Sequence, residues 1–185
     1  MRGTERFGER FYSVPLALID LVEVEAQAEI VPLLPSLSSR MDANRCDALI
    51  FSGGESLGDN PERDSFENDL LAEAVQRSVR VVGICRGFQL IASFFGATIA
   101  PIGGHIATSR LLTQNETRFA SVTCFHEFSV VDASIDPNTL VTAAGDGCVE
   151  GGSFSGTNCL GMMWHPEREP RGSLASSALT KAILH

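Results

Sequence analysis

The sequence lacks the patterns that mark disulfide-stapled, membrane-spanning and nucleic-acid-binding proteins. Its five cysteines are an odd number and include no Cys-x-x-Cys pair, which is typical of reduced thiols in a cytoplasmic protein. No apolar run approaches membrane-spanning length, and the N-terminus has no hydrophobic signal-peptide region. The net charge of −9 argues against nucleic acid as a partner, because a phosphate backbone is bound by clustered Lys and Arg. No metal-ligand spacing stands out among the four histidines, so no metal site is predicted.

What is present is the composition of an ordinary globular protein. The chain has 185 residues, of which 44% are hydrophobic and 20% are charged. This length is enough to bury a sizeable core. We therefore expect a single domain that covers residues 1–185, with no internal repeat.

The strongest signal is the stretch Val79–Phe95, with the sequence VRVVGICRGFQLIASFF. The apolar run that ends at Ile84 predicts a buried parallel strand, and the amphipathic run from Phe88 onward predicts a helix. A strand, a Gly-x-Cys-x-Gly turn and a helix are typical of a nucleophile elbow, whose central side chain projects at the top of the sheet. A helix N-terminus favours a thiolate, so Cys85 is the candidate nucleophile. The alternative is that Cys85 is a small buried hydrophobic residue.

A candidate general base follows much later in the chain, in the segment MMWHPERE. The run Leu160–Trp164 predicts another buried strand, and His165 comes just after its end. Loops that follow the C-terminal ends of parallel strands build the site in α/β sheets, so we expect Cys85 and His165 at the same edge. His165 can take the thiol proton, and Glu167 can orient the imidazole. The alternative is a structural histidine that a backbone carbonyl holds at the start of a helix.

These segments resemble a known family. GICRGFQ and MMWHPERE, together with LIFSGGESLGDNPERDSFE and TCFHEF, are similar to the class I glutamine amidotransferase superfamily, from about residue 5 to the end. CRG and the pair Arg63-Asp64 favour its γ-glutamyl hydrolase branch, peptidase family C26. GGHIAT, AGDGCVEG and MMWHPERE look most similar to the γ-glutamyl-CDP-amidate hydrolases of bacterial capsule phosphoramidate pathways.

The resemblance implies the fold class. It implies an α/β three-layer sandwich with a mostly parallel central sheet, of the flavodoxin-like type. Family members begin with a hydrophobic strand, which this sequence does not show, so the first strand is expected to be missing. Either the start of the chain is misassigned or truncated, or another segment or subunit fills that position.

The resemblance also implies roles for residues around the elbow. The backbone N–H groups of Gly54 and Arg86 would form the oxyanion hole, where such a donor contributes about 3 kcal/mol. The alternative is that Gly53-Gly54 is only a tight turn. Gln89 follows Cys85 by one helical turn and would bind the glutamyl group, unless it is a surface glutamine. The other implied substrate-binding residues are His105, His126, Glu127 and Phe128.

For several polar residues, the sequence allows both a role in the site and a purely structural role. His105, in a glycine-rich loop, lies on the leaving-group side of the site or is a plain loop histidine. Glu150 falls where the resemblance implies a carboxylate facing the site, but an ordinary strand glutamate fits equally well. Asp64 and Glu67 have capping-box spacing and are expected to start a helix. Arg63 either contacts substrate or pairs with a carboxylate.

Hydrophobic periodicity predicts the remaining elements. Helices are expected over residues 5–26, 64–75 and 170–184. Strands are expected over residues 29–34, 46–52, 97–102, 122–125, 130–135, 140–144 and 148–151.

The predicted function is a cysteine-dependent amidohydrolase that cleaves a γ-glutamyl amide of a small molecule and releases glutamate. Cys85 attacks the carbonyl, His165 protonates the departing amine and then activates water, and no metal or organic cofactor is needed. One alternative is a glutaminase subunit that supplies ammonia to a separate synthase, and another is a non-catalytic binding protein. The expected partners are a small γ-glutamyl substrate and either a second copy of the chain or a synthase, without nucleic acid or membrane.

Overall fold

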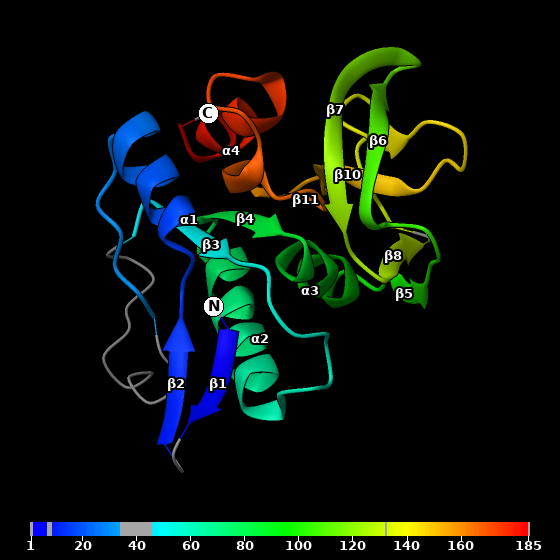
Figure 1. Ribbon diagram of the computed structural model, residues 1–185. Coiled ribbons are helices and arrows are strands. Elements are labelled where there is room, and N and C mark those ends of the chain that lie inside the picture. Colours follow the sequence, from blue (N-terminus) through cyan, green and yellow to red (C-terminus); the bar gives the residue numbers. More distant parts are fainter. Residues whose placement is uncertain (1, 7–8, 34–45, 132, 185) are drawn as a thin grey trace.

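A large mixed sheet runs through the molecule and carries helices on both faces. The computed structural model describes residues 2–6, 9–33, 46–131 and 133–184. The strands of the large sheet follow the order β3-β4-β11-β10-β9-β6-β7, and β8 joins it through β10 and also pairs with β5. Figure 1 shows α2 and α3 on one face of the parallel strands and α1 and α4 on the other. The α/β sandwich expected from the sequence is therefore confirmed.

The element bounds are as follows. The helices are α1 (Leu16–Asp20), the π-helical turn η1 (Leu21–Glu25), α2 (Pro61–Gln76), α3 (Arg86–Phe94), the 3-10 turn η4 (Pro166–Arg168) and α4 (Leu174–Leu184). The strands are β1 (Arg2–Arg6), β2 (Glu9–Ser13), β3 (Ala48–Phe51), β4 (Arg80–Ile84), β5 (Thr98–Pro101), β6 (Ile106–Gln114), β7 (Thr117–Phe125), β8 (Phe128–Val131), β9 (Val141–Ala143), β10 (Val149–Ser153) and β11 (Cys159–Met162). No helix of the described residues is long and apolar enough to cross a bilayer.

Among the described strands, β3, β4 and β11 pair with one another in parallel, and they form the part that matters for the site. β4 lies between β3 and β11, with Phe51 opposite Gly83 and Met162 opposite Ile84. All three strands therefore end at the same edge. β4 is buried on both faces: Val81 packs with α2 and α3, whereas Val82 packs with α1 and α4.

The N-terminal segment differs from the prediction of one helix over residues 5–26. β1 and β2 pair as an antiparallel hairpin, and the first helix begins only at Leu16. Pro15 is the N-cap of this helix, because it has no N–H to continue a helix from upstream and forces the residue before it into an extended conformation. The expected strand over 29–34 is also wrong for its described part. Residues 29–33 have no regular structure, and Pro32 cannot donate to a strand ladder.

The edge of the sheet at β3 is where the strand that the sequence was predicted to lack would lie. Among the described elements, β3 is the outermost strand of the large sheet on that side, and the β1–β2 hairpin is a separate sheet. No described strand therefore occupies the position next to β3. The Ser-rich connection predicted over 35–44 lies outside the described residues.

The helix before β4 starts earlier than the capping-box spacing indicated. Asn60 is the N-cap of α2 and its side chain accepts a hydrogen bond from the Arg63 N–H, while Pro61 takes the first helical position. Asp64 and Glu67 therefore lie inside the helix, and the prediction that they start it is wrong. Their carboxylates are free for long-range partners, which are described below.

Candidate active site

The Gly-x-Cys-x-Gly segment forms the strained turn that its sequence predicts. Cys85 is the N-cap of α3 and has a positive φ of 51°, which is unfavourable for a residue with a side chain. A Cβ on Gly83 would lie 2.5 Å from the Gly87 carbonyl carbon, and a Cβ on Gly87 would lie 1.9 Å from the Phe51 carbonyl oxygen. Both glycines are needed because β3, β4 and α3 touch through bare backbone. This packing fixes the Cys85 side chain at the sheet edge.

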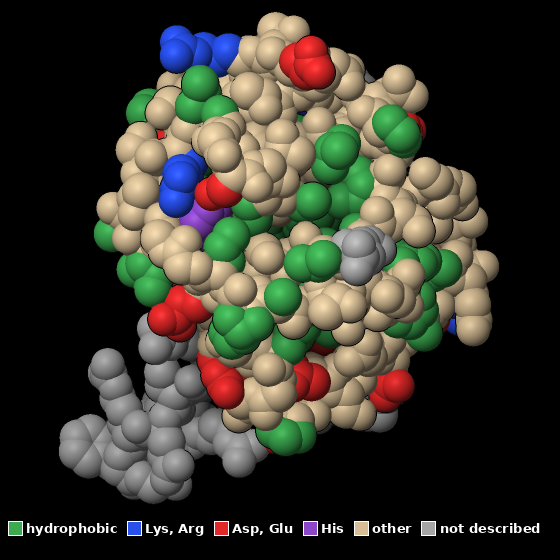
Figure 2. Space-filling model, turned by 90° about the vertical axis from the view of Figure 1, so that its right-hand side faces the viewer, with side chains coloured by type: hydrophobic (Ala, Val, Ile, Leu, Met, Phe, Trp, Pro, Cys, Tyr) green, Lys and Arg blue, Asp and Glu red, His purple; other side chains and the backbone are tan. Residues whose placement is uncertain are grey.

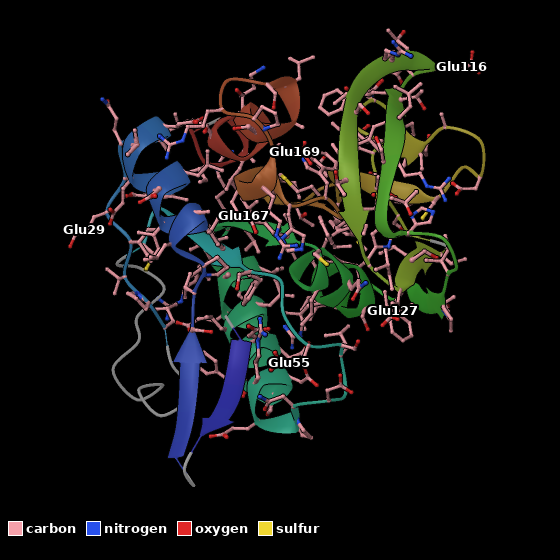
Figure 3. The ribbon with its side chains drawn as sticks, in the orientation of Figure 1. Glu29, Glu55, Glu116, Glu127, Glu167 and Glu169 are labelled. Atoms are coloured by element: carbon pink, nitrogen blue, oxygen red, sulfur yellow. The ribbon has the colours of Figure 1, made fainter. Side chains whose placement is uncertain are left out.

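Cys85, His165 and Glu167 form a linear chain of contacts at that edge. The Cys85 N–H donates to the Met162 carbonyl at 2.7 Å, which ties the elbow to the end of β11. The side chain of Cys85 lies close enough to His165 to raise the pKa of the imidazole, and His165 Nδ1 lies 2.7 Å from Glu167 Oε1. The structure thus brings together three residues from two distant segments. Figure 3 shows Glu167 near the centre of the molecule, between α1 and the ends of the parallel strands.

The protonation of this chain follows from its hydrogen bonds. Burial alone would lower the pKa of His165, but the contacts with Cys85 and Glu167 outweigh it and raise the pKa to about 9. Burial would raise the pKa of Glu167, yet the imidazole beside it holds this pKa below its ordinary value. His165 is therefore protonated at neutral pH beside an ionised Glu167, and can act as a proton donor.

The two predicted oxyanion donors lie on segments that meet at the same point. Arg86 is the first residue of α3, so its N–H has no carbonyl one turn earlier in the helix to bind. Gly53 and Gly54 follow β3, and a Cβ on Gly53 would lie 2.8 Å from His165 Cε1 and 3.6 Å from Cys85 Cβ. The glycine loop therefore passes directly against the sulfur and the imidazole. The oxyanion role itself stays a prediction.

A buried ionic cluster fixes both of these segments. The Arg63 guanidinium is fully buried and donates to Glu67 Oε1 at 2.8 Å and to the Ser52 carbonyl at 3.1 Å, which anchors the glycine loop. The Arg86 guanidinium, also buried, pairs with Glu67 and Asp64. Pairing makes burial of these charges tolerable. Of the two roles expected for Arg63, the structure shows the pair with a carboxylate.

Gln89 lies one turn along α3, as expected, but its amide is already engaged. Its side chain is buried and donates to the Phe128 carbonyl at 3.1 Å. Glu127 is exposed, and together with Phe128 it lines a pocket of about 470 Å³ beside the 101–104 loop. Figure 3 places Glu127 beside α3, on the side of β5 and β8. This pocket includes neither Cys85 nor His165.

His105 and His126 are not in the wall of an open cleft. Their exposed fractions are 0% and 3%, and both face Glu150, which is completely buried. The two rings contact each other edge to face with centroids 4.7 Å apart. The structure thus groups these two histidines around a second carboxylate, that of Glu150.

Two residues beside His165 were not predicted. The Phe125 ring packs edge-on against the His165 ring with centroids 6.2 Å apart, and the Arg168 guanidinium lies 4.7 Å above the Phe125 ring. Phe125 is 38% exposed, which is unusual for a large aromatic residue. The only available sequence signal was its position at the end of an apolar strand, next to the TCFHEF segment.

Comparison with known proteins places the chain in a family. Residues 15–176 match the family "Glutamine amidotransferase class-I". The chain belongs to the class I glutamine amidotransferase family. The match includes the elbow, the glycine loop and the His165–Glu167 segment, so every predicted catalytic residue of this class I amidotransferase domain lies within it.

The relatives of this amidotransferase domain have different named activities. It is 32% identical over 128 residues to the γ-glutamyl-CDP-amidate hydrolase of Campylobacter jejuni, covering 66% of this chain and 62% of that protein. It is 31% identical over 145 residues to the carbamoyl phosphate synthase small chain of Pyrobaculum aerophilum, covering 76% of this chain and 40% of that protein. The domain thus spans less than two thirds of either relative.

Solved structures share the fold at lower identity. A glutamine amidotransferase from Thermotoga maritima superposes with a TM-score of 0.58 at 17% identity, covering 76% of this chain and 65% of that one. A glutamine amidotransferase from Methylobacillus flagellatus gives the same TM-score at 17% identity, covering 83% and 65%. At this identity the similarity concerns the fold alone.

Proposed function

We propose that the domain is a cysteine-dependent amidohydrolase that cleaves a γ-glutamyl amide and releases glutamate. The observation that carries the proposal is the linear contact chain Cys85–His165–Glu167 at the shared edge of three parallel strands. A thiol, an imidazole and a carboxylate in this order form the constellation that activates a thiol nucleophile and later returns its proton.

The reaction follows from these contacts. The Cys85 sulfur, whose proton His165 has taken, attacks the side-chain carbonyl carbon of the glutamyl group, and the N–H groups of Gly54 and Arg86 stabilise the resulting oxyanion. Protonated His165 donates its proton to the departing amine as the C–N bond breaks, leaving a thioester on Cys85. His165, now neutral, takes a proton from water, and the hydroxide attacks the thioester to release glutamate and regenerate the thiol.

Features near His165 favour an anionic leaving group. The Arg168 guanidinium is an exposed cation stacked on Phe125, the ring that packs against the imidazole. A phosphate-linked amine would gain a charge-assisted hydrogen bond there. The relative from Campylobacter jejuni, named for a nucleotide-linked γ-glutamyl amidate, supports the same substrate class.

The test is a substrate panel offered to the purified protein alone. The panel contains glutamine, a γ-glutamyl alkylamide, a γ-glutamyl polyamine and a γ-glutamyl-CDP-amidate, and released glutamate is measured. We expect turnover of at least one γ-glutamyl amide by the wild type and none by Cys85→Ala. Equal activity of the variant, or no turnover together with no alkylation of Cys85 by a glutamine-like chloroketone, would refute the proposal.

A second candidate is a glutaminase that supplies ammonia to a synthase. The relatives that favour it are the carbamoyl phosphate synthase small chain and a GMP synthase of Caenorhabditis elegans, which is 26% identical over 153 residues. This candidate predicts glutamine hydrolysis that is negligible alone and rises when a synthase is added. Turnover of a γ-glutamyl amide without any partner protein favours the first proposal over this one.

A further inference from the structure

A second group of buried ionisable side chains includes neither Cys85 nor His165 and has no role in the proposed reaction. Four residues whose potential ligand atoms all lie within 4.8 Å of one another make up this group, which we call the His-Cys-Glu cluster: His105, Cys124, His126 and Glu150. His105 is the residue before β6, Cys124 lies near the end of β7, His126 is the residue after β7, and Glu150 lies in β10. The exposed fractions of the four are 0%, 0%, 3% and 0%.

The outer nitrogen of each imidazole already has a fixed partner. His126 Nδ1 lies 3.0 Å from the Phe128 carbonyl oxygen, which can only accept, so Nδ1 carries the hydrogen. His105 Nε2 lies 2.9 Å from Asp146 Oδ2, a carboxylate that accepts in the same way. In their neutral forms, both rings therefore present a bare lone pair on the inner nitrogen. This arrangement is typical of metal-binding histidines, whose second nitrogen donates to a carbonyl or a carboxylate.

The inner atoms converge on one point. His105 Nδ1 and His126 Nε2 are 3.2 Å apart, and they lie 3.3 Å and 3.2 Å from Glu150 Oε1. Two nitrogen lone pairs and a carboxylate oxygen at these distances repel one another in a dry interior unless a cation lies between them. The second oxygen, Glu150 Oε2, is buried and has no hydrogen-bond partner.

The distances fit a tetrahedral ion. Metal–ligand bonds of about 2.0–2.3 Å in tetrahedral geometry separate neighbouring ligand atoms by about 3.3–3.6 Å. The three N and O atoms form a nearly equilateral triangle of this size, and Cys124 Sγ, 4.0 Å from Glu150 Oε1, completes the set on a slightly longer edge.

We propose that the His-Cys-Glu cluster binds a divalent transition-metal ion of the zinc class. Two imidazoles, one thiolate and one carboxylate form a borderline-soft N₂SO set suited to Zn²⁺ and its neighbours rather than to Mg²⁺ or Ca²⁺. All four ligands come from the protein and are buried, so no position is left for water or substrate. The site is therefore structural, and it joins β6, β7 and β10.

The bound ion would also fix the position of the Phe128 carbonyl, which contacts Gln89 on the elbow helix α3. The Phe128 carbonyl accepts from both His126 Nδ1, at 3.0 Å, and the Gln89 amide, at 3.1 Å. Fixing the His126 ring therefore fixes the carbonyl that orients Gln89. This consequence rests on the proposed function, whereas metal binding itself does not.

The experiment measures metal directly. The purified full chain, dialysed after expression with zinc, is analysed by mass spectrometry of its elements, and the metal-stripped form is titrated with Co²⁺. We expect about one zinc per chain and the intense visible bands of a tetrahedral cobalt–thiolate site. Tm should rise by about 5–10 °C when Zn²⁺ is 100-fold above its Kd. Asp146→Asn should weaken metal affinity about 10–100-fold.

The matched controls separate this site from the other thiol–imidazole pair. Cys124→Ser and His126→Gln should lose the cobalt–thiolate bands and the bound zinc, whereas Cys85→Ser and Cys159→Ser should keep both. Loss of binding in Cys85→Ser, with retention in Cys124→Ser, would move the ion to the elbow and overturn the proposal. A folded wild type with no zinc, no cobalt bands and no change in Tm would overturn it as well, and would show that the cluster holds a proton instead.

Discussion

The protein contains two groups that combine cysteine, histidine and glutamate, and they differ in how the same atoms are arranged. In the first, the Cys85 sulfur, the His165 imidazole and the Glu167 carboxylate form a line, with one imidazole nitrogen facing each neighbour. In the His-Cys-Glu cluster, the lone pairs point to a common centre. In a line, the imidazole can exchange a proton with the sulfur on one side while the carboxylate on the other side supports its charge, whereas a convergent set holds a cation. Side-chain type alone therefore does not decide the chemistry.

The backbone around the two groups explains the difference. Cys85 lies at a strained turn where parallel strands end, and its neighbours His165 and the glycine loop are also loop residues. The cluster lies between antiparallel strands, where cross-strand neighbours face each other across a short distance. Strand ends leave room for a substrate, but the interior between strands does not.

Figure 2 shows the side of the molecule toward β5 and β8, on which Lys and Arg side chains among the described residues occur singly.

The largest expected effect separates the two thiols. Cys85→Ala should lower kcat on the preferred γ-glutamyl amide by about 10⁴-fold or more, because the covalent intermediate cannot form. The variant should still bind metal, since its sulfur is not a cluster ligand. Initial rates and zinc content of the same preparation check both points, with Cys159→Ser, at a buried thiol outside both groups, as the active control. Turnover of Cys85→Ala near the wild-type level would show that Cys85 is not the nucleophile, and the proposed difference between the two cysteine-containing groups would no longer hold.

Glu167→Gln tests the carboxylate end of the line, next to the imidazole. The amide cannot support the charged imidazole, so we expect kcat to fall by about 10²–10⁴-fold with a smaller change in KM. Steady-state kinetics with the γ-glutamyl substrate measure this. A change confined to KM would mean that Glu167 positions substrate rather than the imidazole.

The elbow should tolerate no added methyl group. Gly87→Ala places a Cβ 1.9 Å from the Phe51 carbonyl oxygen, and we expect the free energy of unfolding to fall by about 3 kcal/mol. Gly103→Ala is the matched control, because its Cβ meets nothing within 4 Å and should change stability by less than about 0.5 kcal/mol. Urea denaturation monitored by circular dichroism gives both values. Equal stability of the two variants would show that β3 and α3 can separate at little cost.

The smallest effect concerns pH. The pKa of His165 is about 9 in the folded state against 6.5 for the free side chain, so the unfolded chain loses this proton first as pH rises. The stability from this group is complete below pH 6.5 and is lost between pH 6.5 and 9. We expect a loss of about 1–2 kcal/mol between pH 6 and 8, and a smaller loss in Glu167→Gln. Urea midpoints at both pH values, compared between the two proteins, isolate His165 from other titrating groups. Parallel pH curves would contradict the raised pKa.

Part of this architecture could be predicted from the sequence because its signals are local. The strand ending at Ile84, the Gly-x-Cys-x-Gly turn and the helix from Arg86 are adjacent, and their apolar pattern matches the observed burial. The same holds for β11, where an apolar run precedes His165.

Other parts could not be predicted, since they depend on partners far along the chain. β6 was not among the predicted strands, since TSRLLTQ is largely polar, yet it pairs with both β7 and β9. Asp64 and Glu67 were expected to start a helix, but they pair with Arg86, which is distant in sequence. A helix over residues 5–26 fitted the apolar spacing, although Pro15 prevents its first half from joining α1.

The sequence by itself determined the strained elbow, because only glycines on either side of Cys85 permit that close backbone approach. It also indicated that His165 follows a buried strand and therefore shares an edge with the thiol. The tertiary structure alone decided which imidazoles meet which carboxylates. His105 and His126 were expected beside the substrate, and the pairing of β6 with β7 instead turns them toward Glu150. Their spacing in the chain carries no such information, since it is cross-strand register that places these atoms within bonding distance of one ion.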